Sequence, residues 1–223
     1  MFFSLSLSLK MIYFDFHHHK RNNPNGIFNL KIGETLPHCY FSIGIHPQEI
    51  DENWEEKFDK IKATSKHKNC LALGECGLDG LINIDETLQK EVFKQQILWA
   101  NEINKPIIIH CVKRFSDLIP FQKIAKTPLI IHGFNKKKII AEEMLKHGFY
   151  LSFGKSVLHS LSLQAILKEI PTEKIFLETD DADFNIEELY LKTAEIKGIT
   201  IENLQEKILE NGSKIFAQKL WQE

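Results

Sequence analysis

The feature of this sequence that most constrains its fold is a series of short, continuously apolar runs separated by longer stretches of mixed polarity. Continuous apolarity, unlike alternation, is typical of strands that are buried on both faces of a sheet. We expect strands in the runs Met11–Phe16, Tyr40–Ile45, Cys70–Leu73, Pro106–Ile109, Leu129–Ile131, Phe149–Phe153 and Lys174–Leu177.

The stretches between these runs have the spacing of amphipathic helices. In residues 85–104, Leu88, Val92 and Ile103 fall on one helical face, and Asp85 stands where a helix N-cap is expected. Similar mixed faces occur in residues 51–66, 136–147, 158–169 and 200–220. Strands that alternate with helices form parallel sheets with helical crossovers, so the sequence predicts an α/β protein.

The length and the N-terminal residues bear on domain organisation. A chain of 223 residues can bury one sizeable core, and it contains no linker rich in Pro, Gly or Ser, so we expect one domain over residues 11–223. The opening MFFSLSLSLK lacks a basic region and a small-residue cleavage site, and it is too short to span a bilayer. Because Met11 directly precedes the first run, we interpret residues 1–10 as a disordered extension or a start-site artefact.

The net charge limits the kind of partner that the protein can attract, and the cysteine content indicates its cellular compartment. The formal net charge of −2 provides no overall attraction for a polyanion, so such a partner requires a local basic patch. The four cysteines form no CxxC pair, which favours free thiols in a reducing, cytoplasmic compartment. Neither a membrane nor an obligate protein partner is indicated.

Side chains that can bind metals follow six of the apolar runs. They are His17 and His19, His46, Glu75, His110, His132, and Glu178 with Asp180. In a β/α barrel the C-terminal ends of the strands converge on one mouth, where such barrels carry their catalytic residues. The sequence therefore predicts a β/α barrel with these side chains gathered at its mouth.

Spacing supports a metal site more than any single residue does. His17 and His19 lie two apart, so both imidazoles point to the same side of a strand. Glu75 follows an apolar run, where an unpaired carboxylate is costly to bury, and its two oxygens can bridge two cations. His110 or His132, taken alone, is more typical of an ordinary core or loop histidine. For His17 and His19 the alternative interpretation is a short histidine tract, and for Glu75 it is a glutamate in a surface loop.

The set of donors indicates which ions fit. Imidazoles and carboxylates without cysteine suit Zn²⁺, Mn²⁺ or Mg²⁺. Two divalent ions bring four positive charges, of which Glu75 and Asp180 cancel two, and the remainder suits a hydroxide with a phosphodiester anion. Two ions about 3.5–4 Å apart can activate water and stabilise the charge that develops on the attacked group. We therefore predict two divalent ions, with Glu75 and Asp180 as catalytic residues.

Seven segments, in order from about residue 12 to residue 217, resemble those of the TatD-type metal-dependent hydrolases of the amidohydrolase superfamily. They are Phe14-Asp15-Phe16-His17-His18-His19, Gly44-Ile45-His46-Pro47, Leu73-Gly74-Glu75-Cys76-Gly77-Leu78-Asp79, Ile109-His110-Cys111, Ile131-His132-Gly133-Phe134, Leu151-Ser152-Phe153-Gly154 and Leu177-Glu178-Thr179-Asp180. The resemblance implies a TIM-type barrel and hydrolysis of phosphodiesters in DNA or of related esters. It also implies that one metal is bound by His17, His19 and Asp180, that the other is bound by His110 and His132, and that Glu75 bridges them.

The sequence also departs from the family pattern. About 25 residues separate His19 from Gly44, which leaves room for a short strand in Ile27–Ile32 but not for a crossover helix before it. We therefore expect a barrel of seven to eight strands that is shortened or distorted near the N-terminus. The arginine-bearing loop that the family has after Asp180 is missing.

Basic residues follow the predicted ligands closely. The chain's only arginines, Arg21 and Arg114, are among them, and with Lys113 and His46 they are the candidate substrate-binding residues. A solvated lysine-rich surface is the alternative interpretation. A DNA-cleaving phosphodiesterase is the favoured function, with nucleic acid as the substrate. An amidohydrolase or esterase that acts on a small carbonyl or phosphoester substrate is the main alternative, and a non-catalytic metal-binding scaffold is the third.

Overall fold

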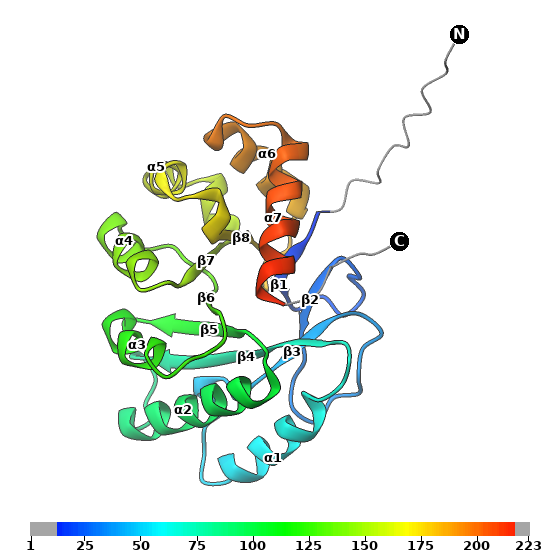
Figure 1. Ribbon diagram of the computed structural model, residues 1–223, viewed down its shortest axis with the longest axis vertical. Helices are drawn as coiled ribbons and strands as arrows, with labels where there is room; N and C mark the ends of the chain where they lie inside the picture. The colour runs from blue at the N-terminus through cyan, green and yellow to red at the C-terminus, as the bar shows by residue number, and fades with distance from the viewer. Residues whose placement is uncertain (1–12, 217–223) are drawn as a thin grey trace.

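The predicted barrel is confirmed in the computed structural model, which describes residues 13–216. Eight parallel strands lie side by side in chain order, with helices around them (Figure 1). The strands are β1 (Asp15–His18), β2 (Gly26–Asn29), β3 (Phe41–Ile43), β4 (Cys70–Asp79), β5 (Ile107–Val112), β6 (Leu129–Ile131), β7 (Tyr150–Phe153) and β8 (Ile175–Leu177).

The first and last strands meet at their C-terminal ends and bring the barrel close to closure. The amide of Asp180 donates to the carbonyl of His17 at 2.9 Å, and the amide of His19 donates to the carbonyl of Asp180 at 3.2 Å. His18 and Asp180 thereby form a parallel bridge. Residues that are far apart in sequence are thus placed together at the barrel mouth.

Seven α-helices lie outside the sheet within the described residues. They are α1 (Trp54–Thr64), α2 (Glu86–Ile103), α3 (Phe115–Gln122), α4 (Lys138–Lys146), α5 (Leu161–Glu169), α6 (Ile186–Lys197) and α7 (Ile201–Ile215). The predicted helix over 85–104 is confirmed as α2, and the Asp85 side chain accepts a hydrogen bond from the Leu88 amide. The sequence did not predict α3 or α6.

The N-terminal side of the barrel is shortened, as expected. No helix connects β1 to β2 or β2 to β3 within the described residues, although both strand pairs are parallel. Gly26 permits the close approach of β1 and β2, because a Cβ there would lie 2.2 Å from the Asp15 carbonyl oxygen. All eight strands are nevertheless present, which is the upper end of the predicted range.

Two strands extend further than their apolar runs. Glu75 lies inside β4 and His110 inside β5, whereas the sequence placed both after a strand. The two strands stay paired from Leu73 opposite Ile107 to Asp79 opposite Val112, so the ladder continues beyond the apolar residues. Glu75 and His110 are therefore held by strand backbone and not by loops.

Three sequence-based expectations are only partly addressed by the fold. No helix in residues 13–216 is long and apolar enough to cross a membrane. All four cysteines are free thiols, as expected, while a cytoplasmic location stays a prediction. The interpretation of residues 1–10 lies outside the described residues, and so does the start of the predicted first strand.

Candidate metal centre

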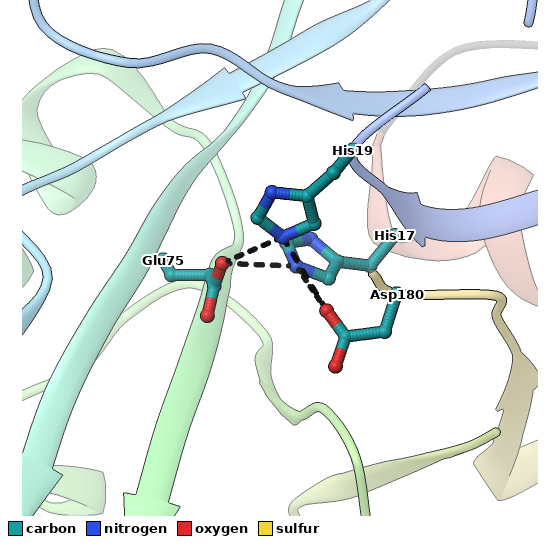
Figure 2. Close-up of side chains that lie close together, drawn as sticks. All are labelled: His17, His19, Glu75 and Asp180. Atoms are coloured by element: carbon teal, nitrogen blue, oxygen red, sulfur yellow. Dashed lines mark ion pairs between the residues drawn. The ribbon is translucent and has the colours of Figure 1, made fainter. Parts of the chain in front are cut away.

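Four of the predicted ligands meet at one point of the barrel mouth, as Figure 2 shows. Nε2 of His17 and Nε2 of His19 each lie 3.2 Å from Oε1 of Glu75. The same two nitrogens lie 3.6 and 3.4 Å from Oδ1 of Asp180. We call these four residues the first cluster; two imidazole nitrogens and two carboxylate oxygens surround a point where one cation would fit.

The local structure of β1 and β8 explains how the first cluster forms. His17 in β1 and His19, the first residue after it, point to the same side because side chains alternate along an extended chain. Beside them, the buried Asp15 carboxylate accepts hydrogen bonds from the Thr179 amide at 2.8 Å and from the Thr179 hydroxyl at 2.7 Å. This contact fixes the chain just before Asp180, which has a positive φ of 53°.

The other oxygen of Glu75 faces three more histidines, which together we call the second cluster. From Oε2 of Glu75, Nε2 of His132 lies at 3.0 Å, Nδ1 of His110 at 3.7 Å and Nε2 of His46 at 3.9 Å. His132 also lies close to Glu178 and to Asp180, so it connects the second cluster with Asp180 of the first cluster. His46, which the sequence predicted to bind substrate, thus lies among side chains that could hold a metal.

The electrostatics of the centre favour a bound cation. Burial raises the pKa of the Glu75 carboxyl, but the charge of His17 and hydrogen bonds from His110 and His132 outweigh it, so the pKa lies far below its ordinary value. Glu75 is therefore ionised although it is only 7% exposed. Among the described residues, the buried nitrogens of His17 and Nδ1 of His132 have no hydrogen bond of good geometry, although Nε2 of His17 lies 3.2 Å from Oε1 of Glu75. A divalent ion would satisfy both the carboxylate and Nε2 of His17, the nitrogen that faces Glu75.

Two further carboxylates stand behind the histidines of the second cluster. Oδ2 of Asp79 lies 3.3 Å from Nε2 of His110, and Oε1 of Glu178 lies 3.6 Å from Nδ1 of His132. Glu178 is fully buried and accepts hydrogen bonds from the Gly133 amide and the Ser152 hydroxyl. Carboxylates in such positions orient metal-binding imidazoles and make them more basic.

Asn29 is a site residue that the sequence analysis missed. Its Nδ2 donates to Oε1 of Glu75 at 2.6 Å, and its Oδ1 accepts from the Glu75 amide at 3.3 Å. The only signal in the sequence was a polar residue directly after the apolar pair Ile27 and Phe28. Asn29 holds the central carboxylate from β2, the strand that lacks a crossover helix.

The metal centre opens into a pocket of about 330 Å³. Beyond the ligands and Asn29, its charged lining residues are Lys31, Glu49 and Asp181. Lys31, which follows β2, was also missed by the sequence analysis; it is the one lysine or arginine among the described residues that line the pocket. The pocket edge therefore carries charges of both signs.

The structure does not bring the other predicted substrate-binding residues into this pocket. Arg21 is held by Glu34 and by the hydroxyl and carbonyl of Thr35. Arg114 lies 2.7 Å from a Glu86 carboxylate oxygen and also faces Asp117 at 3.6 Å. Lys113 is exposed, and it is not among the described residues that line the pocket. A contact of these three side chains with substrate stays a prediction.

Comparison with known proteins agrees with the geometry. The family model described as TatD related DNase matches residues 27–217. This chain belongs to the TatD family. The TatD assignment makes it a metal-dependent hydrolase of ester bonds, built on a barrel whose mouth carries the His, Glu and Asp clusters described above.

Three relatives illustrate the similarity. An uncharacterized metal-dependent hydrolase, YabD of Bacillus subtilis, is 33% identical over 82% of this chain and 79% of its own length. The 3'-5' ssDNA/RNA exonuclease TatD of Citrobacter rodentium is 31% identical over 67% of this chain, which spans 60% of that relative's length. The crystal structure of YjjV, a TatD homolog from Escherichia coli, shares the fold with a TM-score of 0.78 at 16% identity, covering 93% of this chain and 98% of that one.

Proposed function

We propose that this TatD-family protein hydrolyses phosphodiester bonds of single-stranded nucleic acid with two divalent ions bound at the barrel mouth. The observation that carries the proposal is the position of Glu75. Its Oε1 faces His17 and His19, while its Oε2 faces His132 and His110. One carboxylate between two groups of imidazoles is the arrangement that a bridged pair of ions requires.

Each side chain has a distinct part in this proposal. His17, His19 and Asp180 would hold one ion, His110 and His132 the other with His46 beside them as a further donor, and Glu75 both. When bound, such a pair supplies Lewis-acid stabilisation of the attacked phosphoryl group and lowers the pKa of water. The imidazoles suit Zn²⁺, whereas Mn²⁺ or Mg²⁺ would rely more on the carboxylates of Glu75 and Asp180 and on water. Asp79 and Glu178 keep the second-cluster imidazoles in their ligating orientation.

In this proposal Asp180 would accept a proton from the attacking water. Burial raises the pKa of the Asp180 carboxyl, but the hydrogen bond from His19 and the charge of His132 together lower this pKa by more. The net shift of the pKa is therefore downward. Asp180 is thus ionised at neutral pH, and it lines the pocket. A carboxylate in contact with the water is the general base that hydrolysis needs.

The substrate class rests on the relatives and on Lys31. The Citrobacter relative is named as an exonuclease of single-stranded DNA and RNA. Lys31 provides a cation within the pocket, and it has no salt bridge among the described residues. It can pair with the phosphate next to the scissile bond.

A small phosphoester or carbonyl substrate is the second candidate. Glu49 and Asp181 place negative charge at the pocket, and both arginines are already paired with carboxylates. This distribution is less suited to a long polyanion than an open basic groove would be. The same metal pair would hydrolyse a small ester.

The first experiment measures turnover of a single-stranded oligonucleotide with each divalent metal in turn, for wild type and Asp180→Asn. The asparagine keeps the size of the side chain but loses its basicity, so turnover should fall by roughly 10² or more. An Asp180→Asn protein with near-normal turnover would contradict the role of Asp180. Absence of turnover with every metal would contradict the nuclease.

The second experiment separates the two substrate classes. Lys31→Gln should lower the slope of log KM against log salt for a single-stranded oligonucleotide by about 0.7, because one phosphate contact is lost. Hydrolysis of a small activated phosphodiester should stay almost unchanged. Arg114→Ala is the comparison variant: a reduced slope there would support the sequence-based prediction for Arg114. Unchanged slopes in both variants would favour the small-ester function.

A further inference from the structure

Helix α2 carries two buried glutamines on the face that lies against β4. Gln89 is 4% exposed and Gln96 is 1% exposed. The two are seven residues apart, which is close to two helical turns, so their side chains project from the same face. Buried glutamine is uncommon in a helix interior, and each buried amide needs hydrogen-bond partners.

Each glutamine binds both backbone groups of one residue. Oε1 of Gln96 accepts from the Ile45 amide at 2.7 Å, and its Nε2 donates to the Ile45 carbonyl at 3.2 Å. Oε1 of Gln89 accepts from the Asp79 amide at 2.9 Å, and its Nε2 donates to the Asp79 carbonyl at 3.1 Å. A side-chain amide thereby provides the two bonds that a neighbouring strand would otherwise supply.

The sheet explains why these two backbones need a partner. Strand β3 ends at Ile43, so Ile45 lies beyond its ladder. Strand β4 continues to Asp79, which pairs with Val112 of β5 on one side but has passed the end of β3 on the other. Gln96 and Gln89 therefore bind backbone groups that lie beyond the end of the β3–β4 ladder.

Ile45 and Asp79, whose backbone groups the two glutamines bind, are both connected to the second cluster. Ile45 precedes His46, whose Nε2 lies 3.9 Å from Oε2 of Glu75. Asp79 carries the carboxylate that lies 3.3 Å from Nε2 of His110. The two histidines and Asp180 of the first cluster have a different support, because the pairing of β1 with Asp180 fixes their backbone.

We propose that Gln89 and Gln96 are positioning residues that set the geometry of the second cluster and leave the first cluster independent of α2. This inference rests on the proposed pair of ions. Its consequence is that the two ions can be weakened separately by substitutions of residues that belong to neither cluster. Loss of the Gln96 bonds should weaken only the ion held near His46 and His110.

The test uses Gln96→Leu, which keeps a similar volume but removes both hydrogen bonds. Its matched control is Asn211→Leu in α7. Asn211 is another buried amide, whose Nδ2 donates to the carbonyls of Thr172 and Ile175 near the start of β8. Gln96→Met, which removes the same two hydrogen bonds but keeps an unbranched, adaptable side chain of similar length, is the second variant if Gln96→Leu does not fold.

The first measurement is a calorimetric titration of the metal-free full chain with Mn²⁺. We expect two sites in wild type and in Asn211→Leu. In Gln96→Leu one site should weaken about 10–100-fold, the usual effect of losing support behind a metal ligand, while the other stays within about twofold. The second measurement is amide hydrogen exchange of metal-free protein, in which Ile45 and His46 should exchange faster in Gln96→Leu than in Asn211→Leu.

The outcomes separate this inference from the proposed function. A wild-type protein that binds fewer than two ions would overturn the two-ion proposal, and the role of the glutamines with it. Two ions in wild type, with equal weakening of both sites in Gln96→Leu, would overturn this inference alone. An amide exchange rate at Ile45 that is unchanged in Gln96→Leu would also overturn this inference. So would a loss of Mn²⁺ affinity at the same single site in Asn211→Leu.

Discussion

Glu75→Gln is the substitution that most directly tests the metal centre. Glutamine keeps the volume of the side chain, and its remaining oxygen can still accept the hydrogen bond that Asn29 donates at 2.6 Å. The change removes the negative charge and replaces one of the two oxygens, which face different clusters, with an NH₂ group that cannot bind a metal. Both proposed ions should therefore lose affinity together.

The magnitude follows from mass action, because an ion that binds only the folded protein stabilises it. At a metal concentration of about 100 times Kd, each ion adds about 2.7 kcal/mol to the free energy of unfolding. Two ions bridged by Glu75 would add roughly 5 kcal/mol. For a protein of this size 1 kcal/mol corresponds to about 2–4 °C in Tm. Wild type should thus gain about 10–20 °C over its chelated form.

The assay is thermal unfolding with excess metal and with chelator, for wild type, Glu75→Gln and the control Glu49→Gln. Glu49 lines the same pocket but belongs to neither cluster, so its variant should keep the full metal-dependent gain. Glu75→Gln should gain less than about 2 °C. A Glu75→Gln protein with the wild-type gain would refute the assignment of Glu75 as the shared ligand.

Two further predictions concern stability away from the ions. Gly26→Ala should lower the free energy of unfolding by about 1–3 kcal/mol, because the new Cβ would meet the Asp15 carbonyl oxygen at 2.2 Å and push β1 and β2 apart; an unchanged urea midpoint would contradict this. Burial lowers the pKa of Lys197 to about 8, so keeping it charged in the folded state costs stability below pH 8, and this cost diminishes as the pH rises toward 10. Lys197→Met also removes the hydrogen bond that Nζ donates to the Ile170 carbonyl, so the measured quantity is the change with pH: relative to wild type, the variant should be more stable at pH 7 than at pH 10. A difference in urea midpoint that is equal at both pH values would argue against it.

The ligands could be predicted from the sequence because a parallel barrel brings strand ends to one mouth. His17 with His19, and His132, each follow a run that the apolar pattern identified, and the structure gathers them around Glu75. The salt bridge of Arg114 could not be predicted in the same way. Its position after β5 suggested a free cation, but Glu86 at the start of α2 reaches it at 2.7 Å.

The parts of the fold that escaped prediction have local causes. Helix α3 contains Pro120, which interrupts the pattern of a helix although the backbone there stays helical. The roles of Gln89 and Gln96 depend on β3 ending earlier than β4, and sequence periodicity does not reveal the relative lengths of paired strands. The missing helices around β2 were predictable because the interval between His19 and Gly44 is too short to contain them.

The pairing of β1 with the end of β8 has a consequence for the newly synthesised chain. Ligands of the second cluster are contributed by residues 46–132, so all of them leave the ribosome well before synthesis ends. The first cluster combines His17 and His19 with Asp180, and it cannot form until the last strand has emerged. Closing a loop of that length is an entropically costly, late event in folding. A growing chain would therefore acquire its metal-binding capacity in two stages, and occupation of the first cluster would mark a completed barrel.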